Sequence, residues 1–286
     1  MSTHWEGIGM ASGDSPDRPP GRERLTPSGR RAHAISTIIP FMERARTFSG
    51  WNFDDLRVPP LDPLFANGKE TPWDYVALAR ECAAGADRVI DLGTGGGEVF
   101  SRVVDGLSGP RFYAGEEWQV NAPVARDRLR PLGVEVLHAS SERTPYADAA
   151  FDVVLSRHEA IEPPDIARIL RPGGVFLTQQ VAKEQWRELT PFFPNRTVFP
   201  DHLVEYARAF EEAGFVVTTQ HHTWRAAYAS IGEVAFMLMI SPWEFPEFDA
   251  MREIDALLAL EDAYGTEQGI VLTLARYLLV ARKHSG

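Results

Sequence analysis

The sequence of 286 residues has one cysteine, three lysines and no long apolar run, and these shortages exclude several classes of protein. The single cysteine, Cys82, excludes an internal disulfide bond and any zinc site built from cysteine thiolates. The longest nearly unbroken apolar run, Val234 to Ile240, is far too short to cross a bilayer. Residues 1–30 also lack the apolar segment of a signal peptide. We therefore expect a protein of the cytoplasm with no membrane-spanning segment.

The 40 acidic residues outnumber the 29 lysines and arginines, and the formal net charge is −11. A nucleic-acid-binding protein normally presents a basic face, because neutralising phosphates supplies much of its affinity. The one small basic cluster lies in or beside a tail rich in Pro, Gly and Ser, residues 1–30, which we expect to be disordered. Residues 31–286 suit one large domain. A small molecule is therefore a better predicted partner than a nucleic acid.

A glycine-rich turn follows an apolar run that ends in a carboxylate. The run ends with Asp91 and Leu92, and Gly93, Gly95 and Gly97 follow at alternate positions before a helix-like segment. A strand, a tight turn and a helix start form the unit that binds nucleotides. Glycines carry no Cβ, so the backbone can lie directly against a ligand. We expect a nucleotide-type cofactor here.

The residues around this turn narrow the choice of nucleotide. The dinucleotide pattern G-x-G-x-x-G requires a glycine at position 98, where this chain has Glu98, an acid in the place of the pyrophosphate. The Gly-Lys-Ser/Thr sequence of a P-loop is also missing. A cofactor without a pyrophosphate suits this turn better.

Three motifs resemble those of class I S-adenosylmethionine-dependent methyltransferases. The first is Asp91-x-Gly93-x-Gly95-x-Gly97, the second is the Phe151-Asp152 pair before an apolar strand, and the third is the Pro-Gly-Gly turn at 172–174. The resemblance is strong over residues 71–181 and covers residues 203–282 in outline. Within that family the chain is most similar to bacterial small-molecule methyltransferases of the ubiquinone/menaquinone type.

The resemblance implies an α/β fold with a seven-stranded, doubly wound, mainly parallel sheet of order 3-2-1-4-5-7-6. It also implies strands at about 215–219 and 276–282 for the last two positions. Insertions at about 183–200 and 224–273 exceed what this sheet needs, and their aromatic residues could roof the active site as a cap. The alternative is a purely structural cap or the surface of a homodimer.

Two helices are expected before the first strand. Apolar residues at helical spacing predict a helical N-terminal extension from about Arg31, with Pro40 kinking or ending its first half. A second helix is predicted to start with Thr71 as its N-cap and Pro72 at its first position, with Asp74 completing an approximate capping box.

The cofactor that the resemblance implies is S-adenosyl-L-methionine. Asp91 and the first glycines would hold its methionine end, with Trp73 lining that pocket, and Glu116 would accept hydrogen bonds from the ribose hydroxyls. Glu117 is the less favoured ligand, because adjacent strand residues point in opposite directions. Serines stand where the family often has an adenine-binding aspartate. The expected cofactor contacts are Trp73, Asp91, Gly93, Thr94, Gly95, Glu116, Ser140, Ser141 and Ser156.

His158 and Glu159 follow the predicted fourth strand and are the candidate catalytic residues. His158 could take a proton from the substrate, or could be hydrogen-bonded for structure alone. Glu159 could orient His158 or contact the substrate. The pair is not a zinc motif, because H-E-x-x-H would need a histidine where Glu162 stands, and we expect no metal. The pair of histidines at 221–222 lacks carboxylates at metal-binding spacing.

The predicted function is methyl transfer to an oxygen, nitrogen or carbon atom of a small molecule, for example in natural-product metabolism. One alternative is an RNA-modifying methyltransferase of the same fold. The acidic charge and the missing Asn-Pro-Pro-Tyr motif argue against it. The other alternative is a non-catalytic or repurposed protein that binds S-adenosylmethionine.

Overall fold

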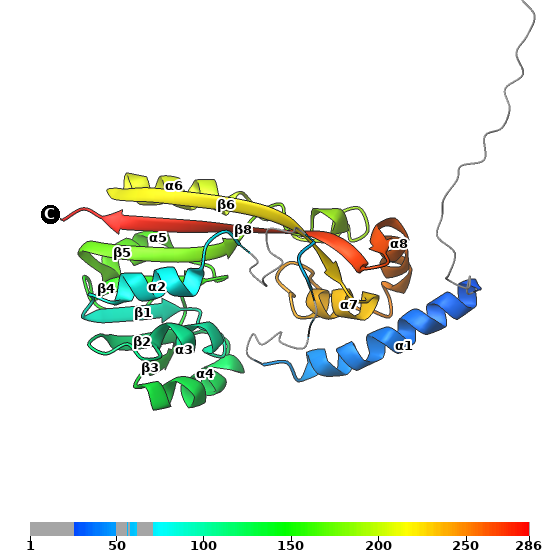
Figure 1. Cartoon of the computed structure of the whole chain (residues 1–286), viewed down its shortest axis with the longest axis horizontal. Coiled ribbons are helices and arrows are strands. Elements are labelled where there is room, and N and C mark those ends of the chain that lie inside the picture. The colour runs from blue at the N-terminus through cyan, green and yellow to red at the C-terminus, as the bar shows by residue number, and fades with distance from the viewer. Residues whose placement is uncertain (1–25, 50–55, 57, 62–70, 286) are drawn as a thin grey trace, which may run out of the picture.

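The computed structural model describes residues 26–49, 56, 58–61 and 71–285 (Figure 1). Most of the predicted disordered tail therefore lies outside the described residues. Residues 27–30, which the sequence placed in that tail, are helical. Within the described residues, no helix is long and apolar enough to cross a membrane.

A mainly parallel sheet forms the core, and the predicted fold class is confirmed. Its order is β3-β2-β1-β4-β5-β8-β6, and β7 pairs with β8 off this path. The long strands follow the predicted order 3-2-1-4-5-7-6, and the two-residue β7 was not predicted. The strands are β1 (Arg88–Leu92), β2 (Arg111–Glu116), β3 (Glu135–His138), β4 (Phe151–Arg157), β5 (Leu170–Val181), β6 (Phe215–Tyr228), β7 (Gly265–Thr266) and β8 (Gly269–Lys283).

Helices cover both faces of this sheet, which explains why its central strands are almost entirely apolar. On one face lie α2 (Tyr75–Ala83), α3 (Glu98–Val104) and α4 (Asn121–Leu129), and on the other α5 (Pro163–Ile169) and α6 (His202–Glu212). Successive side chains of β1 pack on opposite faces of the sheet. Val89 packs with Phe100 of α3, and Ile90 packs with Ile166 and Phe210. This alternation fixes β1 in the centre of the sheet.

A second layer, which we call the cap, consists of α1 (Pro27–Arg46), α7 (Ile231–Met239), α8 (Ile254–Tyr264), the segment 240–253 between them, β7 and the ends of β6 and β8 beyond the core (Figure 1). The predicted strands at 215–219 and 276–282 were too short. They pair without interruption from Phe215↔Lys283 to Tyr228↔Ile270 and carry the cap away from the core. Polar residues in the middle of β6 concealed its length, because the outer side of an edge strand faces solvent.

Two helix predictions need correction. α1 continues through Pro40, because Ala34 and Ile38 are buried in the cap core and their packing offsets the lost backbone hydrogen bond. α2 starts at Tyr75, and its N-cap is Asp74, whose side chain accepts a hydrogen bond from the Ala77 N–H. The predicted N-cap, Thr71, donates its hydroxyl to the Trp73 carbonyl instead.

Candidate functional site

The carboxyl ends of β1, β4 and β5 point toward the cap (Figure 1). In open α/β sheets ligands bind outside these ends, at the point where the strand order reverses. That point lies between β1 and β4, which pair in parallel on the two sides of the reversal. The sequence-predicted site residues can therefore be located at this edge.

The glycine-rich loop between β1 and α3 has the backbone that only glycine adopts readily. Gly93, Gly95 and Gly97 have φ of +67°, +62° and +79°. A Cβ on Gly93 would overlap the Glu159 side chain, and a Cβ on Gly96 would overlap that of Glu98. The loop is therefore a close-fitting cradle with a carboxylate against it on each side.

Glu116, at the end of β2, is turned toward this loop and is only 4% exposed. Its two carboxylate oxygens accept hydrogen bonds from the Gly95 N–H at 2.6 Å and the Trp118 N–H at 2.8 Å. Burial raises the pKa of Glu116, and these two N–H groups oppose the rise. Glu117 is exposed. The loop and the acid of the next strand thus form one unit.

Two further acids lie at the first glycine. Burial raises the pKa of Asp91 to about 7, against the opposing effects of the Thr94 hydroxyl and Arg157. Burial also raises the pKa of Glu159 to about 7, and the negative charge of Glu116 adds to the rise. Both acids are therefore partly protonated at neutral pH and would be stabilised as carboxylates by a cationic ligand.

Two buried hydroxyls without a partner lie on the carboxyl-end side of the sheet, one after β3 and one on β4. Among the described residues, Ser141 Oγ and Ser156 Oγ have no hydrogen-bond partner, although both serines are at most 1% exposed. Ser140 Oγ accepts a hydrogen bond from the Glu142 N–H at 3.3 Å. Ser156 pairs with Leu92, directly before the glycine loop. Buried polar groups are normally satisfied, so these free hydroxyls suit a site that a polar ligand completes.

Trp73, Gln179 and His158 form a hydrogen-bonded row across the sheet edge. The Trp73 indole N–H donates to Gln179 Oε1 at 2.7 Å, and Gln179 Nε2 lies 3.4 Å from His158 Nε2. The Tyr75 hydroxyl donates to the Ser156 carbonyl at 3.2 Å, which holds the start of α2 against β4. Trp73 and His158, predicted separately from the sequence, therefore belong to one connected group.

Two residues of this group, Gln179 of β5 and Arg276 of β8, were not predicted from the sequence. Burial lowers the pKa of His158 well below its usual value, and the charges of Arg157 and Arg276 lower it further. A usable signal existed for Gln179, because two glutamines end the apolar run of β5 at the ligand-binding edge. No comparable signal marked Arg276, whose position depends on the antiparallel pairing of β8 with β5.

No metal site accompanies these residues in the described parts of the chain, where no group of His, Cys, Asp and Glu could hold an ion. His221 instead pairs with Glu184, at 3.0 Å between Nε2 and Oε2.

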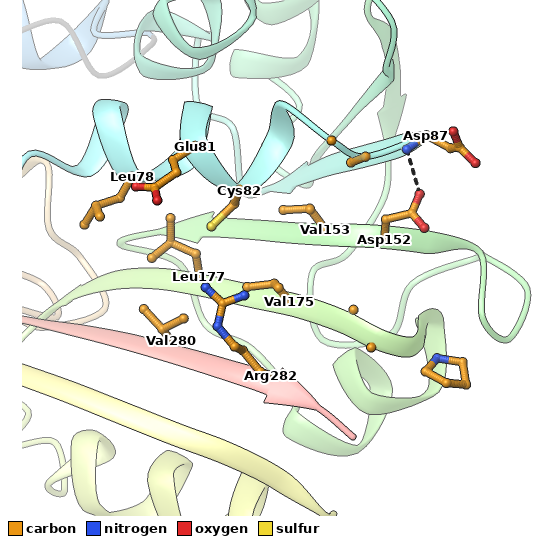
Figure 2. A pocket seen from close by; sticks show the side chains of 15 residues that line it. Leu78, Glu81, Cys82, Asp87, Asp152, Val153, Val175, Leu177, Val280 and Arg282 are labelled. Atoms are coloured by element: carbon orange, nitrogen blue, oxygen red, sulfur yellow. Dashed lines mark hydrogen bonds between the residues drawn. The ribbon is translucent and has the colours of Figure 1, made fainter. Parts of the chain in front are cut away.

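A groove of about 640 Å³ lies at the opposite edge of the sheet (Figure 2). Cys82 of α2, Asp152, Val175 and Arg282 are among its lining residues. They lie where β1, β4 and β5 begin, away from the glycine loop. This groove is therefore not part of the candidate site.

Comparison with known proteins finds a family match over the part of the chain that carries this site. Residues 90–178 match a family described as a methyltransferase domain. The comparison with curated proteins found no match.

Solved structures share the fold at low sequence identity. The YcgJ protein of Bacillus subtilis is 19% identical with a TM-score of 0.54, over 74% of this chain and 99% of its own. A candidate methyltransferase of Bacillus halodurans C-125 is 19% identical with a TM-score of 0.53, over 73% and 98%. A functionally unknown protein of Deinococcus radiodurans R1 is 16% identical with a TM-score of 0.53, over 87% and 99%.

The fold and the matched domain define a Rossmann-like methyltransferase. Residues 90–178 form a methyltransferase domain within this fold, and the matched family implies S-adenosylmethionine as the methyl donor. The site fits that cofactor: a glycine cradle, a buried carboxylate beside it, free buried hydroxyls and two acids suited to a cation lie together. The predicted family, enzyme class and cofactor are thereby confirmed.

Proposed function

We propose that the protein methylates a small molecule, held between the ligand-binding edge of the sheet and the cap. The observation that carries this proposal is the contact of the cap with the cofactor side of the core. The indole of Trp243, which follows α7, meets that of Trp118 edge to face, with ring centroids 5.7 Å apart. Trp118 is two residues from Glu116, so the cap reaches over the strand end that carries the ribose-binding acid.

A roofed site favours a small substrate over an RNA. The cap packs around an apolar core of its own, to which Trp186 and Phe193 of the segment after β5 also contribute, so it is a folded layer. A duplex or a folded RNA would have to displace it, and the net charge of −11 supplies no basic face to compensate. These features support a small acceptor, of natural-product or similar chemistry.

The residues divide by position into two groups. Asp91, Gly93, Thr94, Gly95 and Glu159 would hold the methionine end of the cofactor, Glu116 its ribose, and Ser140, Ser141 and Ser156 its remaining polar atoms. Trp73 and His158 lie where the acceptor would enter. When bound, S-adenosylmethionine supplies an electrophilic methyl group on a sulfonium. The chain's own contribution is to align the acceptor and to exclude water.

Replacing Glu116 with Gln tests this assignment. The neutral amide keeps the size of the side chain but weakens hydrogen bonds to hydroxyls and to the Gly95 N–H. We expect a loss of about 1–3 kcal/mol in the binding free energy of S-adenosylmethionine, measured by isothermal titration calorimetry. Glu117→Gln is the matched control, because Glu117 is exposed beside it. Wild-type protein that fails to bind the cofactor, or equal effects of both variants, would contradict the assignment.

A further inference from the structure

The row Trp73, Gln179 and His158 determines which ring nitrogen of His158 carries its proton. An indole nitrogen is a hydrogen-bond donor only, so the atom of Gln179 that faces Trp73 at 2.7 Å must be the amide oxygen. The amide NH₂ group of Gln179 therefore points the other way. Trp73 and Gln179 are 6% and 5% exposed, so water does not compete for this bond.

On that other side lies His158 Nε2, 3.4 Å from Gln179 Nε2. An amide NH₂ group only donates, so His158 Nε2 must present its lone pair. A neutral imidazole with a lone pair on Nε2 carries its hydrogen on Nδ1. The Trp73 indole thus determines the orientation of the Gln179 amide, and that orientation determines which ring nitrogen of His158 carries the hydrogen.

The same glutamine also fixes the backbone of His158. The His158 N–H donates to the Gln179 carbonyl at 2.9 Å, and His158 has a φ of +58°. A left-handed conformation is uncommon for a residue other than glycine and persists only where its surroundings impose it. Side chain and backbone of His158 are therefore both positioned by one residue of β5.

Its surroundings favour the neutral form of His158. Desolvation of the crowded ring lowers the pKa of His158 well below its usual range, and the positive charges of Arg157 on β4 and Arg276 on β8 add to this effect. Glu159 follows it, and its carboxyl group lies against Gly93. A second proton would have to enter at Nε2, where the new N–H would face the NH₂ group of Gln179. The ring is therefore poorly arranged to accept a proton from a substrate.

We propose that His158 is the neutral tautomer protonated on Nδ1 and donates this N–H to the methyl acceptor, in place of acting as a base. Protein atoms crowd the imidazole, but His158 still has solvent-accessible surface at the carboxyl end of β4, so a ligand can reach it. Trp73 and Gln179 act as positioning residues. The inference rests on the proposed function for its ligand, and it specifies that ligand: the acceptor presents a hydrogen-bond-accepting atom, and its reacting atom needs no proton removed by His158.

Nitrogen-15 NMR of the full chain labelled at histidine tests the tautomer directly. Long-range proton–nitrogen correlation spectra distinguish protonated from unprotonated ring nitrogens, and the His158→Asn variant identifies the signals of His158 by their loss. We expect a protonated Nδ1 and an unprotonated Nε2 from pH 6 to pH 8, with or without S-adenosylhomocysteine. A proton on Nε2, or titration with the ordinary pKa of about 6.5, would overturn the proposal.

Three variants test the row itself. Gln179→Glu places a carboxylate oxygen against Nε2, so Nε2 should become protonated and the ring should be charged at pH 7. Trp73→Phe removes the indole N–H and frees the amide to rotate, so we expect a mixture of the two tautomers. Gln180→Glu is the matched control: the Gln180 amide contacts Thr178 and the Glu159 carbonyl, and the wild-type tautomer should persist.

An unchanged tautomer in Gln179→Glu, with the chain folded by circular dichroism, would refute the role of the row. Calorimetry with S-adenosylmethionine on the same wild-type sample separates the two proposals. Absent cofactor binding would refute the proposed function, and with it the acceptor as the ligand of His158, but not the tautomer, because the tautomer depends only on residues of the chain. A wrong tautomer with normal cofactor binding would refute this inference alone.

Discussion

Asp91 and Glu159 are the residues whose ionisation responds to the cofactor. Both side chains lie near Gly93, and both have a pKa of about 7 in the protein without ligand. The dominant cause is burial, which disfavours a carboxylate that lacks a cation. S-adenosylmethionine carries positive charge at its methionine end, so its binding should favour the ionised form of each acid.

We therefore predict that S-adenosylmethionine binds more tightly as pH rises from 6 to 8. Below a pKa of 7 an acid must first lose its proton, which weakens binding by up to about tenfold per pH unit for each group. Calorimetric titrations across this range should show the dependence, and Glu159→Gln should remove part of it. Glu162→Gln, which changes an exposed acid nearby, should leave the slope as in the wild type. A slope unchanged by Glu159→Gln would contradict the assignment.

At the scale of elements, one arginine connects the segment after β5 to the cap. Arg196 donates to the carbonyls of Gln185 and Trp186, both at 2.7 Å, and pairs with Glu244 at 2.5 Å. The Arg196 and Glu244 side chains are 9% and 11% exposed. Gln185 Oε1 in turn accepts from the Arg276 guanidinium at 2.8 Å. Gln185 therefore links Arg196, and through it Glu244 of the cap, to Arg276 of β8.

Arg196→Ala should reduce the free energy of unfolding by about 3–5 kcal/mol, because Glu244 would remain as a buried charge without its partner. Denaturant unfolding followed by circular dichroism measures the change. Arg187→Ala is the control: this side chain is 66% exposed and its contact with Glu188 is 3.7 Å, so we expect a change within about 0.5 kcal/mol.

The double variant Arg196→Met with Glu244→Leu removes both charges and should recover most of the loss. A single variant as stable as the wild type would show that the pair does not hold the cap.

At the scale of the whole molecule, the cofactor site lowers the stability of the protein without ligand. Asp91 has a folded pKa of about 7 and an unfolded pKa of about 3.9. Between these values the folded state binds more protons than the unfolded state, so this group's contribution to stability falls as pH rises. The contribution is fully present below about pH 4 and lost above about pH 7.

Asp91→Asn should therefore become more stable relative to the wild type as pH increases. Between pH 4.5 and pH 7.5 we expect the difference in the free energy of unfolding to grow by about 2–4 kcal/mol in favour of the variant. Chemical denaturation of both proteins over this range checks it, and taking the difference cancels the other titrating groups. A constant difference would mean that Asp91 titrates in the folded protein as it does in the unfolded chain.

Local sequence predicted the parts of the site that lie close together in the chain, at the ends of two successive strands. The glycine loop, Asp91 and Glu116 were found because an apolar strand, a glycine turn and a second strand fix their relative positions within 30 residues. The roles assigned to them remain predictions. The helix start at Thr71 was wrong because Asp74, three residues later, caps the helix and Thr71 serves a turn instead.

The sequence by itself determined the class of fold and the cofactor, because the periodicity of buried strands and the conformational freedom of glycine act over a few residues. Only the tertiary structure decided how the acceptor side of the site is arranged. Trp73 and Gln179 are 106 positions apart in the chain. Gln179 also reaches His158 because β4 and β5 pair with Arg157 opposite Gln179, a register that short-range pattern does not encode. That register, and through it the proton on His158, is a property of the folded sheet.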